Sequence, residues 1–110
     1  MSGHGRDAAS GVYVVTLVVD LPITKTDALE TIAFACDGAV EGARTASPRV
    51  VLSPGAWAEV QIPKFADPPP LAIDVCSDAS ATAARAAADT LRGALEKLGW
   101  TVRDPRPGEA

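Results

Sequence analysis

Residues 71–99 read LAIDVCSDASATAARAAADTLRGALEKLG, and the spacing of the hydrophobic residues changes within this stretch. Over 71–76, Leu, Ile and Val occupy every second position, a spacing typical of a β-strand. We expect Ser77 or Asp78 to cap a helix that Gly99 ends. Its hydrophobic residues then recur every third, fourth or seventh position: Ala84, Ala87, Ala88, Leu91, Leu95 and Leu98. Because most of these side chains are small, the helix is expected to lie close to a sheet.

The beginning of the chain predicts a second strand and helix. Residues 11–21 are rich in Val and Leu on both faces, which is typical of a central strand, and Pro22 ends them. Thr24 is a suitable N-cap for a helix over 25–37, and Gly38 is its stop signal. One face of this helix carries an apolar stripe of Leu29, Ile32, Ala33 and Cys36.

The middle of the chain predicts a loop followed by a hairpin. Residues 39–48 are small and polar and are interpreted as a loop. Strands are expected at 49–52 and 56–62, joined at Ser53-Pro54-Gly55. Proline followed by glycine favours a type II turn, and this type is not the one that two-residue hairpins prefer. We therefore expect the connecting loop to be wider than it looks.

The remaining elements complete the prediction of fold class. After the proline-rich segment 63–70 come the strand at 71–76, the long helix and a short strand at 100–103. The order β-α-β-β-β-α-β predicts an α+β domain with two helices on one face of a sheet of four or five mainly antiparallel strands. The nearest common architecture is the ferredoxin-like plait or a variant of it. We expect one domain over 11–103 and loose tails at 1–10 and 104–110.

The alternation within the strands predicts which side chains share a face of the sheet. Pairing Val60 with Val75, and Ile62 with Ile73, places the apolar sets of two strands on one side. The opposite side then carries a mixed set that forms our candidate binding surface: Trp57, Glu59, Gln61 and Asp74, with Val50 and Leu52 expected beside Trp57. Since both helices are expected on the other side, this mixed face is predicted to be open.

Composition argues against several classes of protein. With 110 residues, a net charge of −4 and a pI near 4.8, the chain is an acidic single domain, which argues against a nucleic-acid binder. No apolar run is long enough for a membrane helix, and no signal peptide is recognisable. Seven arginines against three lysines indicate a bacterial origin with a GC-rich genome. Two widely separated cysteines, Cys36 and Cys76, indicate reduced thiols and a cytoplasmic protein.

Catalytic and cofactor chemistry finds little support in the residue types. The single histidine, His4, lies in the expected N-terminal tail, so neither a Ser–His nor a Cys–His arrangement is predicted. Two thiols and one tail histidine are too few for a zinc site, and no glycine-rich phosphate-binding motif occurs. We therefore expect no cofactor, no metal and no catalytic residue.

The sequence leads to two functional hypotheses. The first is a non-enzymatic interaction, dimerisation or regulatory module that binds a protein partner, or a second copy of itself, through the open sheet face. The alternative is a small-ligand-binding protein or a small enzyme that uses Glu59 and Asp74 on the same face.

Overall fold

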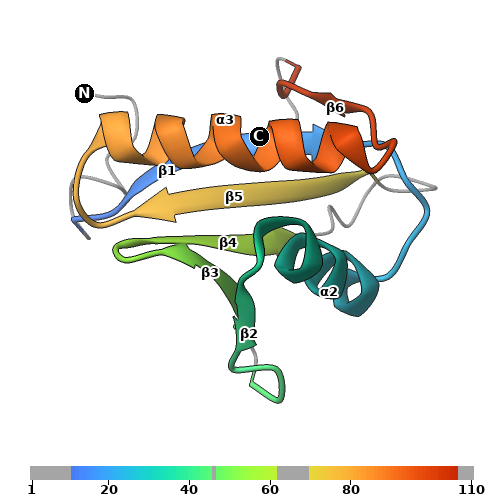
Figure 1. Ribbon diagram of the computed structural model, residues 1–110, viewed down its shortest axis with the longest axis horizontal. Coiled ribbons are helices and arrows are strands. Elements are labelled where there is room, and N and C mark those ends of the chain that lie inside the picture. Colours follow the sequence, from blue (N-terminus) through green and yellow to red (C-terminus); the bar gives the residue numbers. More distant parts are fainter. Residues whose placement is uncertain (1–10, 46, 62–69, 107–110) are drawn as a thin grey trace.

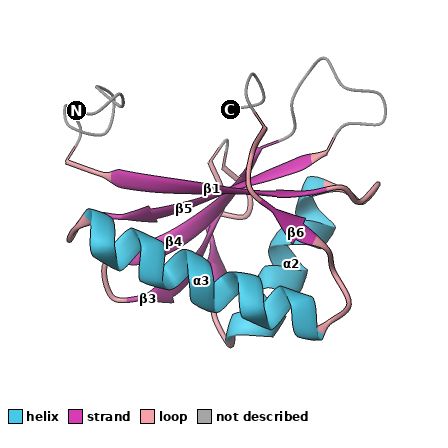
Figure 2. Ribbon diagram, turned by 90° about the horizontal axis from the view of Figure 1, so that it is seen from above, coloured by secondary structure: helices cyan, strands magenta, loops and turns pink. Residues whose placement is uncertain are grey.

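The computed structural model describes residues 11–45, 47–61 and 70–106, and it has two layers. One layer is a sheet of six antiparallel strands, and the other consists of two helices that both lie on one side of it (Figures 1 and 2). In chain order the elements are β1 (Tyr13–Val19), α2 (Lys25–Cys36), β2 (Ala39–Glu41), β3 (Arg49–Ser53), β4 (Ala56–Gln61), β5 (Leu71–Ser77), α3 (Ala81–Lys97) and β6 (Val102–Arg103). The predicted α+β class is confirmed. His4, the expected N-terminal tail and most of the proline-rich segment lie outside the described residues.

The strand order β2-β3-β4-β5-β1-β6 explains both the likeness to a plait and the extra strands. Strand β5 lies between β1 and β4, and β1 lies between β5 and β6. Helix α3 connects β5 and β6, which have β1 between them, and this is the split βαβ arrangement. Helix α2 leads from β1 to β2, which lies at the far edge beyond β5, β4 and β3. Strands β4, β5, β1 and β6 form the four-strand unit of the plait, and β2 and β3 extend it beyond β4.

Strand β2 was predicted as loop, and Gly38 explains why a strand forms there. A Cβ atom at Gly38 would lie 2.4 Å from the carbonyl oxygen of Val51 in β3. Only glycine allows the chain to leave α2 and come directly against β3. Asp37, in the left-handed conformation with φ of 54°, makes the turn out of the helix. Three residues are too few to show a period of two, so alternation gave no signal for β2.

The turn between β3 and β4 is tighter than we expected. Ser53 and Ala56 are paired directly, so only Pro54 and Gly55 form the loop, and Gly55 has a φ of 78°. Positive φ at this position agrees with a type II turn. The twist of a type II turn does not match the right-handed twist of the two strands that it joins. The pairing register shifts between Val51 and Ser53, directly before the turn. The irregularity in β3 therefore accommodates the mismatch that a wider loop was expected to relieve.

The core lies between the sheet and the two helices. Its fully buried members include Leu17, Val60, Ile73 and Val75 from the strands, Ile32 from α2, and Ala84, Ala88, Leu91 and Leu95 from α3. Most of the predicted helical stripes are thus confirmed as core. Ala33, Cys36 and Ala87 are partly buried against it, and Leu98 is 43% exposed. The predicted cap of α3 was wrong, because β5 continues to Ser77 and the hydroxyl of Ser80 accepts from the N–H of Ala83 at 3.0 Å.

Enlarging Ala88 tests whether α3 depends on its small residues to approach the sheet. Ala88 has no exposed surface, so Ala88→Leu forces extra carbon atoms into a filled core. We expect the free energy of unfolding to fall by about 1–3 kcal/mol, measured by urea denaturation. Ala81→Leu, at the exposed start of the same helix, is the control and should change stability by less than about 0.5 kcal/mol. An unchanged midpoint for Ala88→Leu would show that α3 does not pack closely.

Candidate functional site

The face of the sheet opposite the helices carries four of the six residues predicted for the candidate surface. Cross-strand pairing places Trp57 opposite Cys76, Glu59 opposite Asp74, and Gln61 opposite Ala72. The predicted register was wrong by two residues, since Val75 pairs with Ala58 and not with Val60. A shift of two leaves every side chain on its predicted face. We call the surface of Trp57, Glu59, Gln61 and Asp74 the open face.

Val50 and Leu52 were predicted for the open face, and this assignment was wrong. Val50 pairs with Ala58, has no exposed surface and belongs to the core under the helices. Leu52 packs against the same core, where it lines a groove with residues of α2 and α3. A two-residue loop alone would pair Leu52 with Trp57, as predicted. The register shift between Val51 and Ser53 leaves Leu52 as an extra residue, so Val51 pairs with Trp57 instead. This irregularity decided the assignment, and the residue types alone did not reveal it.

Trp57 is held on both sides by charged groups. The guanidinium carbon of Arg49 lies 4.8 Å from the centre of its ring, a cation–π distance. The indole Nε1 donates to Glu59 Oε2 at 2.9 Å. Arg49 is itself 3.6 Å from Glu41 on β2. The half-buried indole is therefore fixed in one orientation and offers an ordered aromatic surface. Sequence analysis missed Arg49, which lies two strand positions from Val51 on the same face.

Asp74 and Glu59 place two negative charges side by side. They are direct partners across β4 and β5, where Cβ atoms are about 4.5–5.5 Å apart and like charges oppose pairing. Asp74 Oδ1 accepts from the hydroxyl of Thr16 at 2.8 Å, from the strand on its other side. Within the described part of the chain, each carboxylate has a neutral donor and neither forms an ion pair. Together they make a negative site at which no cation from residues 11–45, 47–61 or 70–106 forms an ion pair.

No third acidic, histidine or cysteine ligand joins this pair. Among the described residues, no group of three such side chains is arranged to hold a metal ion. Two carboxylates across neighbouring strands can instead accept hydrogen bonds from an ammonium or guanidinium group.

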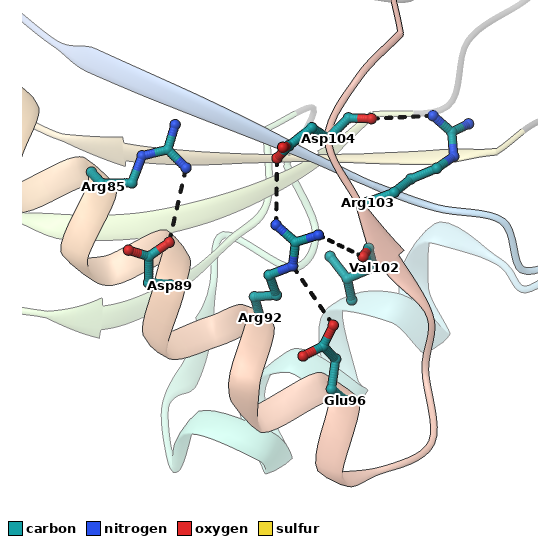
Figure 3. Close-up of polar contacts among 7 residues, drawn as sticks. All are labelled: Arg85, Asp89, Arg92, Glu96, Val102, Arg103 and Asp104. Carbon is teal, nitrogen blue, oxygen red and sulfur yellow. Dashed lines mark hydrogen bonds and ion pairs between the residues drawn. The ribbon is translucent and has the colours of Figure 1, made fainter.

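The two edges of the sheet are short and occupied by charged contacts. Strand β2 has three residues and β6 has two, which leaves little backbone for another strand to pair with. At β6, Arg92 of α3 donates to the carbonyl of Val102 at 2.8 Å and lies near Glu96 and Asp104 (Figure 3). Along α3, Arg85 lies 3.9 Å from Asp89 and Arg92 lies 3.7 Å from Glu96. The two edges therefore expose only short stretches of strand backbone.

Neither cysteine forms a disulfide, and they lie on opposite sides of the sheet, Cys36 in the helix layer and Cys76 in β5. Cys36 is half-buried at the end of α2, and Cys76 is 4% exposed on the open face beside Trp57. Burial raises the pKa of the Cys36 thiol above its ordinary value. The partial burial of Cys36 and the raised pKa of its thiol agree with its place in the predicted apolar stripe of α2.

Comparison with known proteins found no matching family model, no similar curated protein and no similar solved structure. In the part of the chain that the structure describes, no helix is both long and apolar enough to cross a membrane.

A double-mutant cycle measures the hydrogen bond that orients Asp74. We expect Thr16→Val and Asp74→Ala to show a coupling free energy of about 1 kcal/mol in urea unfolding. The cycle cancels the repulsion between Asp74 and Glu59, which Asp74→Ala removes in both backgrounds. A coupling indistinguishable from zero would show that Thr16 does not hold the carboxylate in solution.

The raised pKa of Cys36 predicts slow alkylation. At mildly alkaline pH, less of this thiol is ionised than in a free cysteine, so iodoacetamide should react with it more slowly. The rate should rise with pH, and the midpoint of this rise should lie at a higher pH than for free cysteine. Cys36→Ser, followed by mass spectrometry, identifies the contribution of this thiol against that of Cys76. Reaction as fast as with free cysteine would contradict the prediction.

Proposed function

We propose that this chain is a non-enzymatic protein-interaction module whose open face binds a partner that presents a basic side chain between apolar ones. The pair of adjacent carboxylates, Glu59 and Asp74, carries this proposal. A lysine or arginine of the partner would relieve their mutual repulsion and would occupy a position that no cation among the described residues takes. Cys36 and Cys76 form no disulfide, which supports a cytoplasmic location.

The surroundings of the carboxylates favour a protein partner over a free ion. Trp57 is half-buried and ordered by Arg49 and Glu59, and tryptophan and arginine are the residues most enriched at interface hot spots. Val14 and Val51 are half-buried neighbours on the same face. Aromatic residues and arginine are enriched at protein interfaces relative to the rest of the surface, and Trp57 and Arg49 lie together here.

A second copy of this chain is a poor partner for the open face. A symmetric dimer centred on Glu59 and Asp74 would bring four carboxylates together, and like charges in an interface cost several kcal/mol. The short edge strands disfavour joining two sheets edge to edge. These arguments favour a different chain as the partner at this surface.

A small-ligand-binding protein or a small enzyme is the second candidate, and the same carboxylate pair favours it. Two adjacent carboxylates could hold a small organic cation or exchange a proton with it. Glu59 already accepts a hydrogen bond from Trp57, and Asp74 accepts one from Thr16. These hydrogen bonds favour a site that binds a cation over a site that transfers a proton.

Panning a random peptide library on the immobilised chain tests the proposed function. We expect enriched peptides to contain Lys or Arg flanked by apolar residues. Glu59→Gln with Asp74→Asn should weaken their binding about tenfold or more, a change of about 1.4 kcal/mol, and Trp57→Ala should act in the same direction. Binding is followed for every variant by the fluorescence anisotropy of a dye-labelled peptide.

The control is Glu30→Gln with Asp37→Asn. It removes the same charge from two exposed positions in the helix layer, one in α2 and one directly after it, and should leave peptide affinity unchanged. The proposal fails if no peptide is enriched over a bare support. It also fails if the enriched peptides are acidic, or if they bind the Glu59→Gln/Asp74→Asn chain as tightly as the original.

A further inference from the structure

The helix layer carries an apolar groove on its outer side. Phe34 of α2 is 76% exposed and Leu98, directly after α3, is 43% exposed. They border a groove of about 430 Å³ between the end of α2 and the second half of α3. Its remaining lining consists of Ala35, Asp89, Thr90, Gly93, Ala94 and Lys97. A large exposed aromatic side chain beside small residues is a feature of surfaces that another molecule covers.

Gly93 lies in this groove, and no close contact with the described residues requires a glycine there. It occupies the interior of a 17-residue helix, where only proline is less favourable than glycine. A Cβ atom added at Gly93 would meet nothing within 4 Å. The glycine therefore serves no close approach inside the described part of the molecule. It leaves the backbone of α3 accessible to a molecule outside it.

The charges along the groove indicate what that molecule is. Asp89 and Lys97 lie four residues before and four residues after Gly93, so all three share one side of α3. Within one helix, Asp89 and Lys97 are about 12 Å apart along the axis, which is too far for an ion pair between them. In a second α3 that crosses antiparallel at Gly93, Asp89 of each copy would lie beside Lys97 of the other. Lys97 forms no ion pair within the described residues, and Asp89 has only a 3.9 Å contact with Arg85.

We propose that two copies of this chain form a symmetric dimer through the helix layer, with their α3 helices antiparallel and crossing at Gly93. The geometry satisfies two identical Asp89–Lys97 pairs at once, as a two-fold axis requires. It also covers Phe34 and Leu98 of both copies. Parallel helices would instead bring Asp89 against Asp89.

This dimer is independent of the proposed function. Both helices lie on one side of the sheet, and Glu59 and Asp74 lie on the other (Figure 2). Loss of peptide binding at the open face and loss of the dimer are therefore separate results. In the dimer, the two open faces would point outward and remain accessible to partners.

Charge exchange between the two pairing positions provides the test. Sedimentation velocity from micromolar to near-millimolar concentration should show a dimer for the original chain. Asp89→Lys alone and Lys97→Asp alone should each weaken it about tenfold or more, because each places like charges together twice. An equimolar mixture of the two variant chains should recover the dimer as a heterodimer, since both of its pairs are again complementary.

Phe34→Ser and Gly93→Leu test the packing at the same groove. Both positions are away from the core, so each variant should keep its urea midpoint or gain stability while losing the dimer. Glu59→Gln with Asp74→Asn is the control and should leave the dimer intact. The inference is overturned by a monomer at every concentration. It is equally overturned by a dimer that Phe34→Ser and the charge reversals leave unchanged, or by a mixture that fails to recover it.

Discussion

The register between β4 and β5 determines both what the core contains and what the open face displays. Side chains alternate between the two faces of a strand, so placing Val60 beside Ile73 in the core also places Glu59 beside Asp74 on the other side. A slip of β4 by one residue against β5 would turn Val60 outward and Glu59 into the core. The two carboxylates are therefore held together by the packing beneath them and by no attraction of their own.

The relative size of these effects explains why the carboxylate pair persists. Fully burying one valine or isoleucine contributes about 1.5–3 kcal/mol, and several such residues lie under the helices. Opposed like charges on a half-exposed sheet face cost about 1 kcal/mol or less. Hydrogen bonds from Thr16 and Trp57 offset part of that cost. The fold can thus keep a locally unfavourable pair, and such pairs are where a partner gains most from a complementary charge.

Sequence analysis was most successful where alternation or helical spacing extends over many residues. The two helices, the α+β class and the face of Trp57, Glu59, Gln61 and Asp74 all follow from such patterns. It was wrong where a single backbone geometry decides the result. The close approach at Gly38 creates β2, and the register shift between Val51 and Ser53 moves Val50 and Leu52 to the core side. Arg49 was missed because this shift, which determines its cross-strand neighbours, leaves no signal in the residue types.

Small side chains on α3 have opposite consequences on its two sides. On the inner side, Ala84 and Ala88 have no exposed surface and allow the helix to lie directly on the sheet. On the outer side, Gly93 and Ala94 leave a groove against α2 that larger residues would fill. Close packing on the sheet accounts only for the inner positions, because a Cβ atom added at Gly93 would meet no described atom within 4 Å. A helix selected only for stability would carry alanine or a longer side chain there. The glycine is therefore better explained by contact with another molecule than by the fold of this chain.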